Sequence, residues 1–255
     1  MRVVFLGKHK RSAARALDWL VGAGADVVAV VAPKPDSLTR EPQRLDLVAE
    51  RHGLPLACDS QLYDRPPENV DVVVSFLFWK LIREPLLSLA RIGSLNFHPA
   101  PLPDLRGLGG LNVAILEGHE QWGVSCHFVD EHFDTGDLVE VERFPIDNEA
   151  ETAFSLDLKS QERLLALFKR VMQQALNGGE LPRTPQGEGR YVTREEFEAL
   201  RLVRPGDDLR RKLRAFWYPP HPGAQAEVDG RDLTLVDEWL LSQAAEAYRD
   251  AGHIP

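Results

Sequence analysis

The first half of this chain alternates between short β-branched runs and helical patterns. This alternation limits the possible fold more than any other feature of the sequence. The runs are apolar enough to be buried on both faces, as strands of a sheet covered by helices must be. The alternation predicts βαβ units and an α/β fold with a mostly parallel sheet flanked by helices. The expected strands are Val3 to Leu6, Asp26 to Val31, Val70 to Ser75 and Ser94 to Phe97, and the expected helices are Ser12 to Val21, Glu41 to His52 and Glu84 to Ala90.

The pattern changes after Gly123. Two extended runs, Val124 to Val129 and Leu138 to Phe144, are joined by a polar turn and predict a strand pair. A long helix is expected from Thr152 to Leu176, because apolar residues recur at helical spacing until the glycines that follow Asn177.

A linker rich in proline, glycine and charge follows, so we expect a catalytic domain over residues 1–180 and a small C-terminal subdomain over residues 181–255. This appendage contains a predicted β-hairpin, Ala224 to Val228 and Arg231 to Val236, with the turn-forming dipeptide Asp229-Gly230 between the strands. Apolar surface on the appendage could support a homodimer.

The composition of the chain limits its expected binding partners and cellular compartment. The 255 residues include 39 acidic and 30 basic side chains, a formal net charge of -9, so nucleic acid is not an expected partner. Only two cysteines occur, which favours a reduced, cytoplasmic protein. The longest apolar stretch, Val72 to Trp79, is interrupted by Ser75 and is far shorter than the roughly 20 residues of a membrane span. We therefore expect no membrane segment.

The chemistry is concentrated where the strand Ser94 to Phe97 ends and a proline-rich loop begins. Period-two alternation puts Asn96 and His98 on the same side of the chain. An amide can stabilise a developing oxyanion and an imidazole can exchange a proton near neutral pH, which are the demands of acyl transfer. By themselves, these two residues could equally cap a turn and satisfy a backbone group.

A second polar segment delivers a carboxylate. The strand Val124 to Val129 runs into Asp130-Glu131-His132-Phe133-Asp134-Thr135-Gly136, and Asp134 could orient a histidine or stabilise positive charge on it. The histidines at positions 98, 119, 127 and 132 match no zinc spacing, so no metal site is expected. The first strand is followed by neither a dinucleotide nor a phosphate-loop signature.

Together the two segments resemble the signature of the folate-dependent formyltransferase family: Asn, one residue, His, a proline-containing loop, and later an Asp-Thr-Gly turn. The resemblance covers roughly the first 180 residues and implies a Rossmann-like fold. It assigns Asn96, His98 and Asp134 to catalysis and implies 10-formyltetrahydrofolate as the formyl donor. In relatives the pterin ring lies in a pocket made largely by backbone. Here the corresponding residues are Phe78, Trp79, Lys80, Leu81, Ile82, Asp130 and Asp134. For apolar members of this segment, core packing is an alternative role.

Within that family, the loop after His98 and the segment around Trp217 and Tyr218 are similar to those of sugar-nucleotide N-formyltransferases. The resemblance implies a nucleotide-linked amino sugar as the acceptor. Trp217 and Tyr218 could stack on its base, although they could equally attach the appendage to the main domain. Lys8 could meet a phosphate, with plain solvation as the alternative, and Arg106 is a further substrate candidate. A methionyl-tRNA formyltransferase, a 10-formyltetrahydrofolate hydrolase and a non-enzymatic folate- or nucleotide-binding regulator are the alternative functions.

Overall fold

The computed structural model describes residues 1–34 and 44–250, and for residues 245–250 it describes only the backbone. The chain divides into two compact units. The first unit comprises Met1–Asp104, Gly123–Arg143 and Ser160–Gly189, and the second comprises Leu105–Trp122, Phe144–Lys159 and the chain from Arg190 onward. Both units are assembled from several separate segments of the chain. The predicted domain boundary between residues 180 and 181 stays a prediction.

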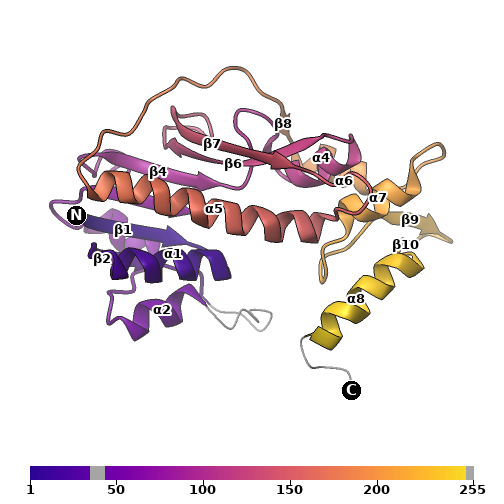
Figure 1. The fold of residues 1–255 in the computed structure, drawn as a ribbon, viewed down its shortest axis with the longest axis horizontal. Coiled ribbons are helices and arrows are strands. Elements are labelled where there is room, and N and C mark those ends of the chain that lie inside the picture. The colour runs from indigo at the N-terminus through magenta and orange to yellow at the C-terminus, as the bar shows by residue number, and fades with distance from the viewer. Residues whose placement is uncertain (35–43, 251–255) are drawn as a thin grey trace. The chain divides into compact units, whose positions relative to one another are not determined.

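A six-stranded sheet organises the first unit (Figure 1). Its order is β2-β1-β3-β4-β6-β7; neighbours among the first four strands run parallel, and β6 is antiparallel to β4. The predicted mostly parallel sheet is therefore confirmed, and the predicted strands differ from the observed ones by three residues at most. The strands are β1 (Arg2–Gly7), β2 (Asp26–Val31), β3 (Val72–Phe76), β4 (Gly93–His98), β6 (Gln121–Phe128) and β7 (Leu138–Pro145).

Aromatic rings hold the long helix α5 (Ala153–Leu176) against one face of this sheet. Phe168 of α5 meets Phe5, Phe76 and Phe97, with ring centroids 6.2, 5.5 and 4.9 Å apart and the rings close to edge-on. Such edge-to-face pairs stabilise a core beyond the area they bury. The helix predicted from Thr152 to Leu176 is confirmed and begins at Ala153. Its apolar face covers the strands.

Three shorter helices complete the described part of the first unit: α1 (Arg11–Gly22), α2 (Leu45–Arg51) and α3 (Asp59–Asp64). Helix α1 lies beside α5, and α2 lies beside α1 (Figure 1). The predicted helix from Ser12 to Val21 is confirmed. The helix predicted from Glu41 to His52 is observed from Leu45, and residues 41–43 of it lie outside the described residues.

The helix predicted from Glu84 to Ala90 is wrong, because residues 84–88 form a turn. One helical hydrogen bond forms, from the Leu87 amide to the Arg83 carbonyl oxygen. The Glu84 carboxylate accepts hydrogen bonds from the amide and the hydroxyl of Ser88, which offers the backbone an alternative to continuing the helix. Leu86 fills the core on this side of the sheet, so the apolar spacing reflects burial without a helix.

The second unit is built from short elements. They are β5 (Arg106–Gly107), α4 (Gly110–Leu116), β8 (Tyr191–Val192), α6 (Arg194–Arg201), α7 (Leu209–Phe216), β9 (Gln225–Val228), β10 (Arg231–Thr234) and α8 (Glu238–Asp250). The predicted hairpin is confirmed as β9 and β10, and Asp229 and Gly230 have φ angles of 52° and 72°, the left-handed conformation that a tight hairpin turn needs.

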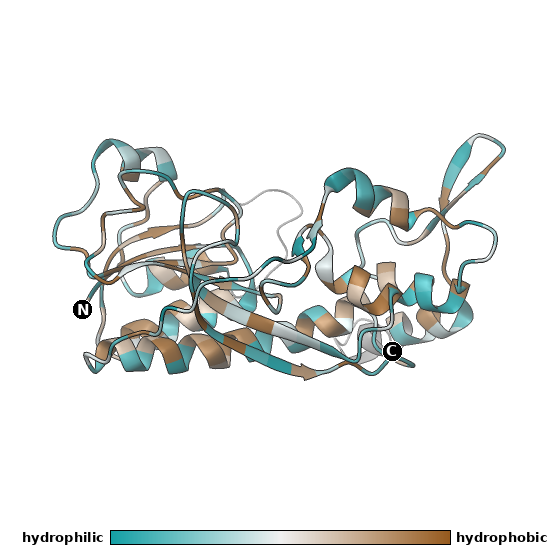
Figure 2. Ribbon diagram, turned by 90° about the horizontal axis from the view of Figure 1, so that it is seen from above, coloured by the Kyte–Doolittle hydropathy of each residue, from teal (hydrophilic) through white to brown (hydrophobic). Residues whose placement is uncertain are grey.

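The hydropathy of the helices agrees with one face of each being buried. In Figure 2 the helices are banded in brown and teal along their length, as expected for helices with one buried face. Within residues 1–34 and 44–250, no helix is long and apolar enough to cross a membrane.

Candidate active site

The candidate site is built where β4 ends, with a strand on each side of it. Parallel pairing places Ser75 of β3 opposite Asn96, and antiparallel pairing places His127 of β6 opposite Asn96 from the other side. His98 is the last residue of β4. The carboxyl end of a parallel strand is where open α/β sheets place their ligands.

Asp134 brings the polar side chains together at one oxygen atom. Its Oδ1 accepts a hydrogen bond from Asn96 Nδ2 at 3.2 Å and lies 3.3 Å from Nδ1 of His98. The structure therefore places the three predicted catalytic side chains in one cluster. The side chains of His98 and Asp134 are only 17% and 14% exposed, so charges in the cluster are shielded weakly by water.

The turn that carries Asp134 is held by its neighbours. Asp134 itself has a φ of 58°, a left-handed conformation that is uncommon for residues other than glycine. Both carboxylate oxygens of Asp130 accept from the Thr135 hydroxyl, at 2.7 and 2.9 Å, and one of them also accepts from the His132 amide. Asp130 thus has a structural role in the turn, and its predicted contact with the formyl donor stays a prediction.

Gly136 lets this turn pack on β6. A Cβ atom at Gly136 would lie 2.0 Å from the Phe128 carbonyl oxygen. We expect Gly136→Ala to destabilise the fold by about 1–3 kcal/mol, because the backbone must move to relieve the clash. Gly22→Ala at the end of α1 is the matched control, since its Cβ meets nothing within 4 Å. Urea unfolding would measure both variants, and equal stabilities would contradict this interpretation of the turn.

His127 is a member of the cluster that the sequence did not reveal. Its side chain is 2% exposed, and its Nδ1 lies 2.7 Å from the Phe128 carbonyl oxygen. A carbonyl oxygen can only accept, so Nδ1 of His127 carries a proton. Its Nε2 lies 3.0 Å from Nδ2 of Asn96 and 3.5 Å from Oδ1 of Asp134. The signal in the sequence is a histidine in a mostly apolar strand that also contains Ser125.

Ser125 of β6 fixes the loop that follows His98. Its buried hydroxyl donates to the Ala100 carbonyl oxygen at 2.6 Å and accepts from the Leu102 amide at 2.9 Å. These bonds hold the proline-rich loop on the strand next to β4. The position of His98 is thereby constrained from both its strand and its loop.

Burial sets the charge state of His98. Removal from water lowers the pKa of His98, the Asp134 carboxylate opposes this by raising it, and His127 adds a smaller lowering effect. The net direction is downward, which favours the neutral imidazole at neutral pH. With Nδ1 facing the carboxylate, the favoured tautomer keeps its proton there and leaves Nε2 as a base.

The residues predicted to hold the formyl donor lie on the segment after β3. Lys80 and Leu81 line an open pocket with Tyr63 and with Phe133 from the acidic turn. The ammonium of Lys80 donates to Asp59 at 2.6 Å.

The rings of Phe78 and Trp79 pack together, with Trp79 41% exposed. Ile82 is 2% exposed and packs in the core, so its predicted contact with the formyl donor stays a prediction.

The residues predicted to bind the acceptor are dispersed between the units. Lys8 is exposed and follows β1, whose carboxyl end lies at the same sheet edge as that of β4. Arg106, Trp217 and Tyr218 belong to the second unit. The Tyr218 hydroxyl donates to Asp157 at 2.6 Å. The four residues are thus divided between the two units, and their substrate roles stay predictions.

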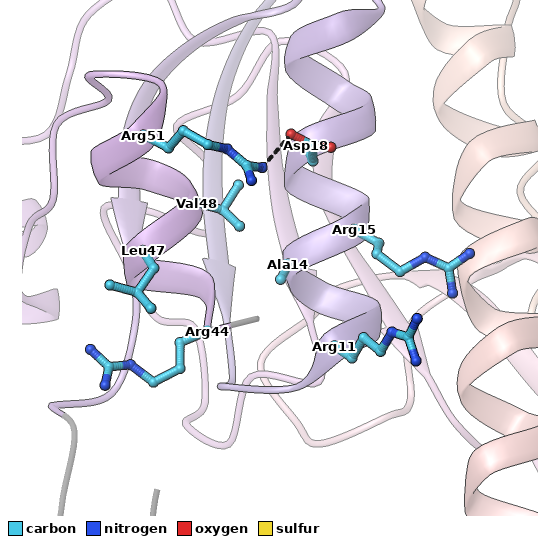
Figure 3. A pocket seen from close by; sticks show the side chains of 8 residues that line it. All are labelled: Arg11, Ala14, Arg15, Asp18, Arg44, Leu47, Val48 and Arg51. Atoms are coloured by element: carbon cyan, nitrogen blue, oxygen red, sulfur yellow. Dashed lines mark hydrogen bonds and ion pairs between the residues drawn. The ribbon is translucent and has the colours of Figure 1, made fainter. Parts of the chain in front are cut away.

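A separate pocket lies between α1 and α2, where arginines project from both helices (Figure 3). Three of these arginines have carboxylate partners: Arg51 pairs with Asp18 at 2.7 Å, Arg44 with Asp46 at 2.8 Å, and Arg15 with Glu162 at 2.5 Å. The positive charge of the pocket is therefore largely balanced, and none of the predicted site residues line it.

Among the described residues, no group of three or more His, Cys, Asp or Glu side chains is arranged to hold a metal ion. The cluster consists of an amide, two imidazoles and a carboxylate. Such a set can donate to an oxyanion and accept a proton at the same point.

Comparison with known proteins agrees with this chemistry. The GDP-perosamine N-formyltransferase of Brucella melitensis is 34% identical over 163 residues, which are 63% of this chain and 62% of the relative's length. The methionyl-tRNA formyltransferase of Novosphingobium aromaticivorans is 28% identical over 257 residues, 96% of this chain and 84% of the relative.

Solved structures share the fold. The N-formyltransferase of Helicobacter canadensis, in complex with folinic acid and dTDP-3-aminofucose, superposes with a TM-score of 0.73 at 19% identity, over 92% of this chain and 87% of that one. A 4-N formyltransferase from Francisella tularensis gives 0.75 at 19% identity, over 92% and 97%. A sequence profile described as formyl transferase matches residues 1–172, two thirds of the chain. The chain is therefore a member of the formyl transferase family.

Proposed function

We propose that this protein transfers a formyl group from 10-formyltetrahydrofolate directly to the amine of a nucleotide-linked amino sugar. The observation that carries the proposal is the cluster at the end of β4, where Asn96 and His98 both meet Oδ1 of Asp134. Binding alone would not require an amide donor, a neutral imidazole and a carboxylate at one point, whereas acyl transfer to an amine uses all three.

The roles follow from the geometry. As the amine nitrogen bonds to the formyl carbon, Asn96 Nδ2 donates to the oxygen that becomes negative. His98 accepts the proton that the amine loses at Nε2, and Asp134 stabilises the resulting imidazolium from the other side of the ring. The bond between the formyl carbon and the folate nitrogen then breaks, and that nitrogen takes the proton back from His98. No covalent bond to the enzyme is needed.

The first unit also suits the donor. The pocket lined by Lys80, Leu81 and Phe133 adjoins the acidic turn and combines apolar surface with the ion pair of Lys80 and Asp59. The N-formyltransferase of Helicobacter canadensis was solved with folinic acid, which supports a reduced formylfolate as the donor for this chain.

Several observations favour a sugar nucleotide over tRNA as the acceptor. The Brucella melitensis relative is a GDP-perosamine N-formyltransferase, and the Helicobacter canadensis structure of similar fold was solved with dTDP-3-aminofucose. The described part of the second unit contains only two-stranded sheets, which offer no large platform for an RNA stem. The chain's formal net charge of -9 also opposes a polyanion. A cytoplasmic homodimer without a nucleic-acid partner is part of this proposal.

An acceptor screen tests the proposal. The protein is incubated with 10-formyltetrahydrofolate and a panel of GDP- and dTDP-linked amino sugars, and products are read by mass for one added formyl group. At least one amino sugar should be formylated, and its N-acetylated form should not. Failure of every acceptor, with the protein folded, would overturn the proposed substrate class.

Methionyl-tRNA is the second candidate acceptor, because the match to a methionyl-tRNA formyltransferase extends over 84% of that relative. Formylation of charged initiator tRNA that weakens steeply with salt would favour this candidate. Release of formate in the absence of any amine would instead indicate a hydrolase.

The lowered pKa of His98 predicts the pH dependence. The base is active when neutral, so kcat should be constant at higher pH and fall as pH drops through the pKa of His98. Because burial lowers that pKa, the midpoint should lie below the ordinary histidine value of about 6.5. The measurement is a kcat profile corrected for ionisation of the acceptor amine. A midpoint well above 6.5 would contradict the assigned environment of His98.

A further inference from the structure

We propose that Ser75 is a positioning residue that holds the Asn96 amide in its catalytic orientation. This inference rests on the proposed function, because it assigns a role toward the formyl-transfer site. Ser75 lies in β3, directly opposite Asn96 in the parallel register. It is 4% exposed and is the one polar residue among the five of β3.

The direction of the hydrogen bond is determined by the other members of the cluster. Asn96 Nδ2 lies 3.2 Å from Oδ1 of Asp134, a carboxylate oxygen that can only accept, and 3.0 Å from Nε2 of His127. The amide oxygen must therefore point the other way, and it lies 2.7 Å from the Ser75 hydroxyl. An amide oxygen can only accept, so the Ser75 hydroxyl donates to it.

The hydrogen bond from Ser75 to the Asn96 amide oxygen does not have to break during catalysis. When Asn96 donates to the substrate oxygen, at least one of its N–H groups must leave His127 or Asp134. The bond from Ser75 lies on the opposite end of the amide and does not compete with the substrate. It therefore keeps the amide plane fixed while the N–H groups change partners, and preorganised donors are what lower the barrier.

Donation from Ser75 also strengthens the donor itself. A hydrogen bond received at the amide oxygen draws electron density from the nitrogen, which makes the N–H groups better donors. Both effects act on the transition state, where the substrate oxygen carries charge, and little on substrate binding. Losing Ser75 should therefore lower kcat while leaving KM nearly unchanged.

The test compares Ser75→Ala, Ser75→Thr and a matched control. We expect Ser75→Ala to lower kcat about tenfold, less than removal of a whole oxyanion donor. Ser75→Thr keeps the hydroxyl and should restore most of kcat. Ser94→Ala is the control, because Ser94 is also buried but donates to the backbone oxygens of Leu86 and Leu87. It should leave kcat unchanged. An unchanged kcat in Ser75→Ala would overturn the proposal.

A double-mutant cycle separates positioning from a general structural effect. In an Asn96→Ala background, Ser75→Ala should cause no further loss of kcat, because there is no amide left to orient. An equal loss in both backgrounds would overturn the positioning role. If Asn96→Ala itself leaves transfer intact, the proposed function fails instead, so the two failures are distinguishable.

The side-chain amide resonance of Asn96 gives a readout without activity. Its hydrogens should exchange faster with solvent in Ser75→Ala than in the unaltered protein and in Ser94→Ala. Unaltered exchange in Ser75→Ala would contradict the claim that the hydroxyl fixes the amide.

Discussion

Replacing Asp134 with asparagine should lower kcat for formyl transfer by on the order of a thousandfold while leaving the fold intact. Asparagine tolerates the left-handed conformation that Asp134 adopts, at a φ of 58°, so the backbone of the turn should be preserved. What is lost is the carboxylate charge that raises the pKa of His98 against burial. Without it the buried imidazole is a weaker base and its protonated form is unsupported.

Glu131→Gln is the matched control for this change. It removes one negative charge from the same turn, at an exposed position outside the cluster. Its kcat should stay close to that of the unaltered protein. Equal losses of activity in the two variants would contradict the assigned role of Asp134, since a general charge effect would then be sufficient.

Asn96→Ala should lower turnover by on the order of a hundredfold or more, which is the usual cost of losing one preorganised oxyanion donor. KM for the acceptor should change little, because the interaction belongs to the transition state. Stability should fall modestly, since the Ser75 hydroxyl and His127 Nε2 each lose a partner. Steady-state kinetics, with circular dichroism to verify folding, measures the effect.

Asn177→Ala serves as the comparison, because Asn177 is exposed just after α5 and bonds only locally to Gln173. This variant should retain full activity. A loss in Asn96→Ala that appears only in KM would argue that the amide binds the ground state, contrary to the assigned role.

Much of the fold could be predicted, because parallel strands that helices cover on both faces are short, continuous apolar runs in the sequence. A run such as Val72–Phe76 is almost wholly apolar, and the helices between such runs have one apolar face. The catalytic motif is also local: Asn96 and His98 lie two residues apart on one strand, and Asp134 lies in a short turn.

The rest of the site depends on register between strands, which no local pattern encodes. Ser75 and His127 lie 21 and 31 residues from Asn96 in sequence and reach it only because β3 and β6 pair with β4 on opposite sides. Each is a polar residue in a buried strand: Ser75 is the one polar residue of β3, and His127 shares β6 with Gln121 and Ser125. That signal marks a buried hydrogen bond but does not name its partner.

The helices that were predicted wrongly or missed have several causes. The segment from Glu84 to Ala90 has helical spacing, yet the hydrogen bond from Ser88 to Glu84 and the burial of Leu86 make it a turn. The helices α6, α7 and α8 of the second unit were not predicted. Two of them, α6 and α7, have only eight residues each, which is shorter than the window in which helical periodicity can be recognised.

A structure of the protein with an unreactive 10-formylfolate analogue is the sharpest test of the site assignment. The measured quantities are the distances from the formyl group to the Asn96 amide and to the imidazole of His98. We expect the formyl oxygen to lie about 3 Å from Asn96 Nδ2 and the formyl carbon to face His98. A folate bound elsewhere, with the cluster in contact with no part of it, would contradict the assignment.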